Sequence, residues 1–81
     1  MSDDLELEFT IEPFVPAQPG PHVQAAIDAA RSVGLEVIVG PFGSRVVGSP
    51  EQVLDGADRI LREALTHGAT RVSLQVARTD P

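Results

Sequence analysis

Four polar side chains alternate with hydrophobic ones near the start of this 81-residue sequence, and three of the four are carboxylates. The polar positions are Glu6, Glu8, Thr10 and Glu12. Closely spaced carboxylates can carry out acid–base chemistry when one of them is desolvated, and they can also balance the charge of a bound cation. The sequence gives no sign of desolvation around these positions. Two interpretations stay open. One is a solvated or self-associating face whose carboxylates are neutralised by Arg from neighbouring strands or a second subunit, and the other is a cleft for a small cationic ligand, for which Glu8 or Glu12 supplies the countercharge.

A second stretch contains residues that could bind a ligand. It is VGPFGSRVVGS (Val39–Ser49), which combines three glycines and a proline with one of only three aromatic residues. The face of an aromatic ring attracts planar rings and cations, so Phe42 is a candidate ligand contact at the tip of a hairpin. Gly40 and Gly43 permit close approaches of the backbone there, and Ser44 can hydrogen-bond a ligand. Two structural alternatives stay open: Phe42 plugs the end of the core or a subunit contact, and Ser44 bonds its own backbone in a turn.

Arg71 and two histidines complete the set of candidate polar residues. Arg71 could clamp an anionic group through two hydrogen bonds, or it could form a structural ion pair with the acidic face. His22 lies near the start of one predicted helix and His67 at the end of another, where a cation is favoured. Two such histidines are too few for a metal site, so we expect no metal.

Other chemistries are not supported by the sequence. No serine-containing stretch resembles a nucleophile elbow, and the glycine-bearing stretch lacks both the P-loop ending and the dinucleotide fingerprint. There is no Lys for a Schiff base and no Cys for a thiolate or a disulfide. We therefore expect neither catalysis nor a cofactor.

The charge balance and the length narrow the function class further. The sequence has twelve acidic and six basic residues, for a net charge of −6. This charge argues against nucleic acid as a partner. The sequence begins with polar and acidic residues and contains no long apolar segment, so we expect a cytoplasmic protein without a membrane span. The length fits one small domain, residues 1–81, for which oligomerisation would supplement a small core.

Hydrophobic periodicity predicts the elements that position the candidate residues. Alternation over Leu5–Glu12 is typical of a strand with one buried face, and the prolines of Pro13–Gly20 indicate a loop. Helical spacing predicts helices over Pro21–Val33 and from the capping residue Ser49 to His67. Short hydrophobic runs predict three more strands, at residues 35–39, 44–47 and 71–76, before a loose tail at residues 79–81.

The order βαββαβ predicts an α+β, ferredoxin-like sandwich: a four-stranded antiparallel sheet in the order 4-1-3-2, with both helices on one face. We call the other face of the sheet the open face. Strand alternation places the acidic side chains of the first strand on this face. By the same argument Arg71, Ser73 and Gln75 flank them on one side, and Arg45 and Val47 flank them on the other if Val46 is buried.

Three segments in this order resemble the YkoF and MTH1187-like thiamine-binding protein family. They are IEPF, GLEVIVGPFGSRVVG and GATRVSLQVAR, within a resemblance that spans Leu5–Arg78. The family pattern is matched at Gly40, Pro41, Phe42, Gly43, Gly48, Arg71 and Val72. Ser44 stands where the family usually has Thr, and Val47 stands where it commonly has Glu. The resemblance implies a ferredoxin-like domain that assembles into dimers or tetramers and binds thiamine or a related pyrimidine without known catalysis.

The leading expectation is therefore a cytoplasmic, non-enzymatic binding protein for thiamine or its hydroxymethylpyrimidine precursor, acting as a homo-oligomer. The expected ligand-binding residues are Glu8, Thr10, Glu12, Phe42, Gly43, Ser44 and Arg71. Two alternatives belong to other classes: a structural or regulatory assembly module without a small-molecule ligand, and a small enzyme that uses the carboxylates.

Overall fold

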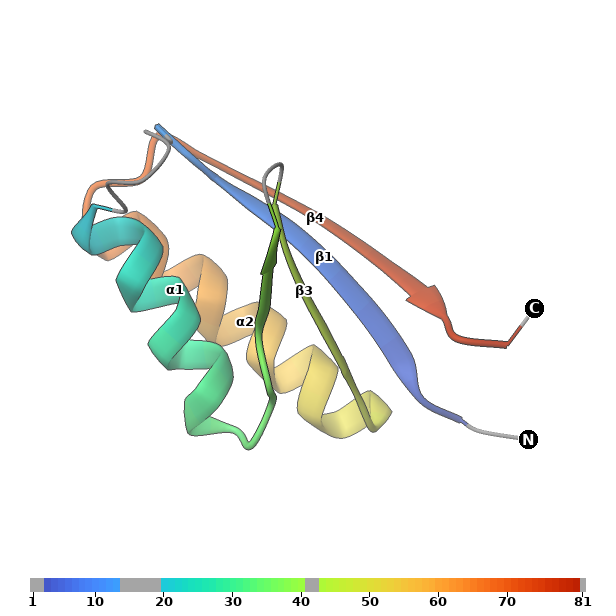
Figure 1. The fold of residues 1–81 in the computed structure, drawn as a ribbon. Coiled ribbons are helices and arrows are strands. Elements are labelled where there is room, and N and C mark those ends of the chain that lie inside the picture. The colour runs from blue at the N-terminus through green and yellow to red at the C-terminus, as the bar shows by residue number, and fades with distance from the viewer. Residues whose placement is uncertain (1–2, 14–19, 41–42, 81) are drawn as a thin grey trace.

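Six elements form two layers, a four-stranded sheet and a pair of helices. The computed structural model describes residues 3–13, 20–40 and 43–80. The elements are β1 (Leu5–Glu12), α1 (Pro21–Ser32), β2 (Ile38–Gly40), β3 (Gly43–Gly48), α2 (Pro50–Thr66) and β4 (Arg71–Arg78). The strands pair antiparallel in the order β2-β3-β1-β4, and both helices cover the same side of the sheet (Figure 1). The predicted ferredoxin-like α+β fold with strand order 4-1-3-2 is confirmed.

The central strand β1 supplies the middle of the core. Leu7, Phe9 and Ile11 are 0%, 3% and 4% exposed and pack with α-helical residues such as Ile60. Val46 of β3 is 1% exposed, so its neighbours in sequence project from the opposite side of the sheet. The predicted division of β1 and β3 into a core face and an open face is therefore confirmed.

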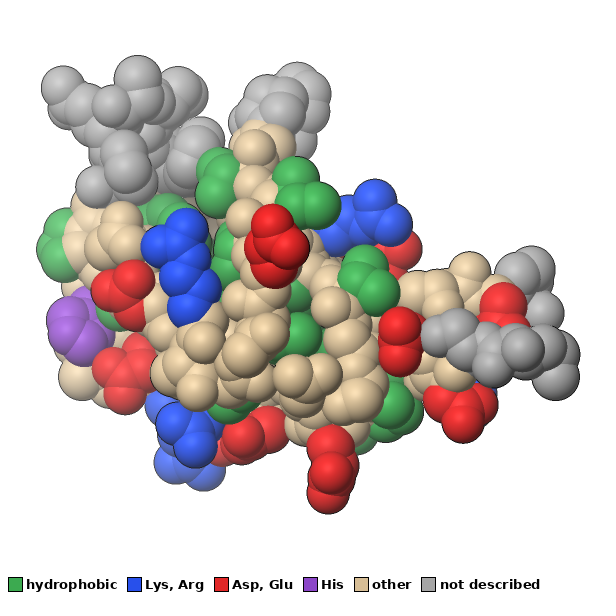
Figure 2. Space-filling view, turned by 60° about the horizontal axis from the view of Figure 1, so that its bottom comes forward, with side chains coloured by type: hydrophobic (Ala, Val, Ile, Leu, Met, Phe, Trp, Pro, Cys, Tyr) green, Lys and Arg blue, Asp and Glu red, His purple; other side chains and the backbone are tan. Residues whose placement is uncertain are grey.

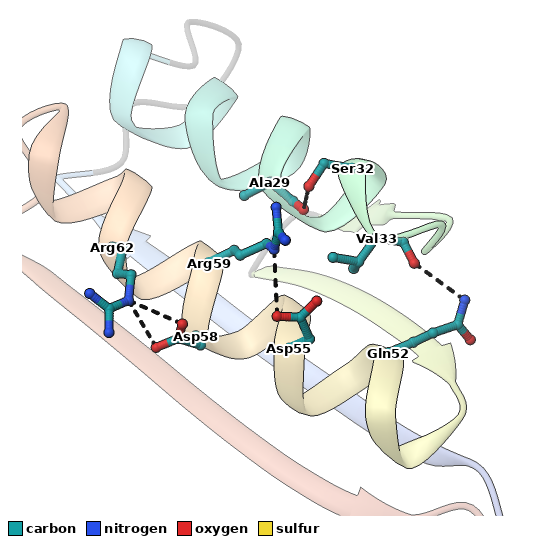
Figure 3. A network of polar contacts seen from close by, with 8 residues as sticks. All are labelled: Ala29, Ser32, Val33, Gln52, Asp55, Asp58, Arg59 and Arg62. Atoms are coloured by element: carbon teal, nitrogen blue, oxygen red, sulfur yellow. Dashed lines mark hydrogen bonds and ion pairs between the residues drawn. The ribbon is translucent and has the colours of Figure 1, made fainter.

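Ser49 and Gln52 form the capping box that starts α2. The Gln52 backbone N–H donates to Ser49 Oγ at 3.2 Å, and the Ser49 backbone N–H donates to Gln52 Oε1 at 3.2 Å. The side-chain amide of Gln52 also donates to the Val33 carbonyl at 3.3 Å, as Figure 3 shows. One side chain thus caps α2 and joins it to the end of α1.

The second strand is shorter than predicted, because it begins at Ile38 rather than at Leu35. Gly34 has a φ of 85°, a left-handed conformation that ends many helices. The backbone N–H of Leu35 then donates to the Ala30 carbonyl at 3.2 Å. Leu35 is therefore part of the α1 terminus.

The Leu35 side chain fills a space that two glycines leave open. A β-carbon on Gly48 would lie 2.6 Å from Leu35 Cδ2, and one on Gly56 would lie 2.8 Å from Leu35 Cδ1. Leu35 is 4% exposed. Its hydrophobic character reflects burial between β3 and α2, which sequence periodicity alone does not distinguish from a strand.

The last strand is longer than predicted and ends at Arg78 instead of Val76. Beyond it, the Thr79 backbone N–H and hydroxyl both donate to the Asp4 carbonyl, at 3.3 and 3.2 Å. Thr79, the first residue of the tail predicted at residues 79–81, is therefore bonded to Asp4, the residue before β1. Pro81 lies outside the described residues.

Charged side chains of both signs are interspersed on the molecular face drawn in Figure 2. On α2, Arg59 pairs with Asp55 at 3.5 Å and Arg62 with Asp58 at 3.0 Å (Figure 3). All four of these side chains are more than half exposed, so each pair contributes only about 0.3–0.5 kcal/mol. Among the described residues, no helix has the length and hydrophobicity needed to cross a membrane.

Candidate functional site

The open face is built in rows that run across the strands. Directly opposite residues on neighbouring strands project to the same side of a sheet. Glu8 of β1 lies between Arg45 of β3 and Gln75 of β4, and Arg45 in turn lies opposite Ile38 of β2. The next row toward the end of β1 contains Thr10 and, opposite it, Ser73. Carboxylate, guanidinium, amide and hydroxyl groups therefore gather on this face.

A hollow of about 440 Å³ lies over these two rows. The long side chains of Glu8, Arg45 and Gln75 border it, as does the aliphatic side chain of Ile38. Its other lining residues are Phe9, Thr10, Gly40, Gly43, Ser44 and Ser73. We call this feature the open-face hollow.

Two paired glycines keep the floor of the hollow low. Gly40 of β2 lies opposite Gly43 of β3, so neither strand places a side chain there. A β-carbon on Gly43 would lie 3.0 Å from Thr10 Cγ2 and 3.1 Å from the Phe9 carbonyl oxygen. The backbone of β3 therefore approaches β1 at a distance that only glycine accommodates without displacing its neighbours. Hairpin residues Pro41 and Phe42 lie outside the described residues, and the prediction for Phe42 remains a prediction.

The charged groups of the hollow are not paired as their register suggests. Arg45 lies directly opposite Glu8, but its Nη2 atom forms an ion pair with Glu6 Oε2 at 2.8 Å. Glu8 is exposed and makes no hydrogen bond or ion pair with any described residue. The open-face hollow thus contains one carboxylate whose charge is not balanced within the described chain.

Glu12 and Arg71 lie outside the hollow, although sequence reasoning grouped them with it. They face each other at one end of the β1–β4 pair, and Arg71 Nε lies 3.7 Å from Glu12 Oε2. Their side chains are 53% and 73% exposed. This geometry corresponds to the structural ion pair that was the alternative for Arg71, and it leaves Glu8 as the acidic residue within the hollow.

Ser44 borders the hollow mainly through its backbone. Its register partner is Phe9, whose side chain is buried in the core, so the Ser44 side chain leaves β3 on the helix side of the sheet. Thr10 and Gly43 remain as predicted residues that line the hollow from the open side. The structure therefore brings together Glu8, Thr10 and Gly43 with the backbone of Ser44.

Six lining residues were outside the predicted set, namely Phe9, Ile38, Gly40, Arg45, Ser73 and Gln75. Strand alternation had already placed Arg45, Ser73 and Gln75 beside the acidic face. What was lacking was the register, because a shift along the strand changes which of them stand beside Glu8. Ile38 lies within the strand predicted at residues 35–39, but no face was assigned to the residues of that strand.

Val47 lies opposite Glu6 on the open face and is 42% exposed, as alternation predicts. It does not line the hollow. The carboxylate that the resembling family commonly has at this position would therefore stand beside Glu6, and its absence leaves Glu8 in place.

The histidines form separate contacts at helix ends. His22 Nε2 contacts the Pro13 carbonyl oxygen, and His67 Nδ1 lies 2.8 Å from the Glu63 carbonyl oxygen. Within residues 3–13, 20–40 and 43–80, no three acidic or histidine side chains are grouped as a metal site requires.

A second hollow, of about 460 Å³, lies between the helices and is bordered by Asp28, Arg59, Glu63 and His67. Its charges are mixed, and Arg59 is already paired with Asp55.

The fold is shared with solved structures of low sequence identity. Neither a protein-family model nor a curated protein matches the sequence. The hypothetical protein MJ1052 from Methanocaldococcus jannascii is similar at 20% identity and a TM-score of 0.70, over 99% of this chain and 86% of that one. A domain of unknown function, DUF77, from Bacillus cereus has 20% identity and a TM-score of 0.56, over 93% and 73% of the two chains.

A third similar structure is a "putative thiamine biosynthesis/salvage protein" from Thermotoga maritima. It has 23% identity and a TM-score of 0.54, over 91% of this chain and 80% of that one. At these identities the similarity establishes the fold that the chains share.

Proposed function

We propose that this protein binds thiamine or its hydroxymethylpyrimidine precursor in the open-face hollow, without catalysing a reaction. The observation that carries the proposal is the Glu8 carboxylate, which has no partner among the described residues and borders a hollow floored by Gly40 and Gly43. A volume of about 440 Å³ lies within the range of ~300–1,000 Å³ that is common for small-molecule sites.

The groups around the hollow suit a flat, cationic ligand with polar edges. Glu8 offers a negative charge, Thr10 and Ser73 offer hydroxyl groups, and Gln75 offers an amide that can both donate and accept. Ile38 is 63% exposed and offers a hydrophobic surface against which a ring can pack. Thiamine combines a permanently charged ring with an aminopyrimidine, so it matches both the charge and the polar groups.

The choice of thiamine over other cations is supported by two further points. The motifs around Gly40–Gly48 and Arg71–Arg78 resemble the YkoF and MTH1187-like thiamine-binding family, and we propose that the chain is a member of it. A Thermotoga maritima protein whose description names thiamine biosynthesis or salvage shares the fold. Binding without turnover is supported by the exposure of Glu8 and Glu12, because acid–base catalysis by paired carboxylates depends on desolvating one of them.

We further propose that the protein works in the cytoplasm as a dimer or tetramer. The exposed strand edge at β2 carries Ile38 and Val39, which are 63% and 59% exposed. Such an edge can pair with a second subunit. The same exposed edge favours the second candidate function, a structural or regulatory assembly module without a small-molecule ligand.

Calorimetric titration of the purified protein tests the proposal. Ligand-stripped protein is titrated with thiamine, its phosphates and hydroxymethylpyrimidine, and sedimentation analysis is run on the same samples. We expect saturable binding of at least one compound, which Glu8→Gln weakens. Glu36→Gln is the matched control, because Glu36 is exposed and lies outside the hollow. Flat titrations at millimolar ligand, together with self-association, would favour the assembly module.

A further inference from the structure

Arg45 stands between two carboxylates of β1 and pairs with only one of them. Its register partner is Glu8, whereas its ion-pair partner is Glu6 at 2.8 Å. We propose that Glu6 is a positioning residue: it holds the Arg45 guanidinium away from Glu8 and so keeps the Glu8 carboxylate available to a cationic ligand. This inference rests on the proposed function and identifies how the charge of that site is set.

Both carboxylates are within the range of the Arg45 side chain. Glu6 and Glu8 are two residues apart on one face of β1, a separation of about 6.8 Å along a strand. Long side chains reach both the directly opposite residue and its diagonal neighbours across an antiparallel pair. The Arg45 guanidinium can therefore pair with either carboxylate, and the carboxylate that it does not pair with keeps its full charge.

The surroundings explain why Arg45 pairs with Glu6. The Glu6 side chain is 24% exposed and lies in a row between Val47 and Ala77. Hydrophobic neighbours reduce the screening of a charge pair by water and so strengthen it. Glu8 is more exposed and borders the open-face hollow, where water screens its charge until a ligand enters.

Removing the Glu6 charge should redirect Arg45. In Glu6→Gln, the nearest remaining carboxylate on the open face is Glu8, so the guanidinium pairs with it and neutralises the hollow. Thiamine then loses its electrostatic attraction although Glu6 does not line the hollow. Hydroxymethylpyrimidine, which lacks the charged ring, should bind as before.

A double-mutant cycle provides the test. Wild type, Glu6→Gln, Arg45→Gln and the double variant are each titrated with thiamine and with hydroxymethylpyrimidine. We expect Glu6→Gln to weaken thiamine binding by about threefold to tenfold, the scale of one partly screened charge pair. In the Arg45→Gln background the same substitution should have no such effect, because no guanidinium is left to redirect. An equal loss for both compounds, or a loss that persists without Arg45, would overturn the inference.

A crystal structure of ligand-free Glu6→Gln separates this inference from the proposed function. We expect Arg45 to lie within ion-pair distance of Glu8 in this variant, whether or not the wild type binds thiamine. If Arg45 stays away from Glu8 while the wild type binds, the positioning role is wrong and the binding function stands. If Arg45 moves but the wild type binds neither compound, the positioning role stands and the proposed function fails. If Arg45 stays and the wild type binds neither compound, both are wrong.

Discussion

Gly40 and Gly43 lie opposite each other across the β2–β3 hairpin, and both line the open-face hollow without adding a side chain to it. The row of residues beyond them carries the polar groups, and the glycines give a ligand room to reach those groups. The depth of the hollow and its chemistry therefore come from adjacent rows of the same sheet.

Gly43→Ala should reduce both stability and ligand binding. The new β-carbon would meet Thr10 Cγ2 at 3.0 Å and the Phe9 carbonyl oxygen at 3.1 Å, and the second of these belongs to the central strand and cannot move easily. We expect a loss of about 1–3 kcal/mol in the free energy of unfolding, as for other overpacked sites, measured by urea denaturation. Gly68→Ala is the control. The φ of 106° at Gly68 disfavours alanine, but nothing lies within 4 Å of the added β-carbon. This variant should therefore lose stability and keep its affinity for thiamine.

Glu12→Gln should have little effect on thiamine binding, in contrast to Glu8→Gln. Glu12 pairs with Arg71 and lies outside the hollow, and charges separated by water are screened. We expect Glu12→Gln to change the dissociation constant by less than about twofold and the free energy of unfolding by less than ~1 kcal/mol. A loss of affinity equal to that of Glu8→Gln would mean that the ligand extends to the end of the β1–β4 pair.

Salt should weaken the binding of thiamine but not of hydroxymethylpyrimidine. Glu8 is exposed, so its attraction for a cation is open to screening, and the Debye length falls from about 30 Å at 0.01 M to about 10 Å at 0.1 M salt. We expect the thiamine dissociation constant to rise by roughly twofold to fivefold over this range. Titrations in sodium chloride at fixed pH measure the effect, and an identical salt response of both compounds would exclude Glu8 as the cause.

Ser49→Ala should destabilise the fold without changing the site. The substitution removes the hydroxyl that accepts from the Gln52 backbone N–H, and loss of such a cap costs about 1 kcal/mol. Thermal and urea unfolding should both report the loss. Ser49→Asp keeps an acceptor at the same position and should retain most of the stability, whereas equal destabilisation by both variants would show that the cap is not the cause.

The architecture was predictable because each element carries its own local signal. Alternation at Leu7, Phe9 and Ile11 fixed the buried face of β1, and the Ser49–Gln52 pair marked the start of α2. Leu35 was misassigned to a strand because its burial arises from Gly48 and Gly56, which are distant in sequence and contribute only empty space. Periodicity indicates which positions are hydrophobic, but it does not indicate which element covers each of them.

The candidate site was predictable only in part, for a related reason. Strand alternation placed Glu8 and Thr10 on the open face, and the glycines marked the hairpin. It did not reveal that Gln75 stands beside Glu8 or that Glu12 stands beside Arg71, since both facts depend on register. Strand alternation also could not reveal that Arg45 pairs with Glu6 and not with Glu8, because this depends on the positions of the three side chains.

The pairing of β1 with both β3 and β4 has a consequence for how the chain folds during synthesis. Leu5 pairs with Gly48 on one side and with Arg78 on the other, so both partners of the central strand are made long after it. Contacts of such high sequence separation slow folding, because the entropy of closing the intervening chain is lost before they form. Until β3 and then β4 leave the ribosome, both edges of β1 lack the strands that take up its backbone hydrogen bonds, so the central strand cannot complete its pairing until nearly the whole chain has been made.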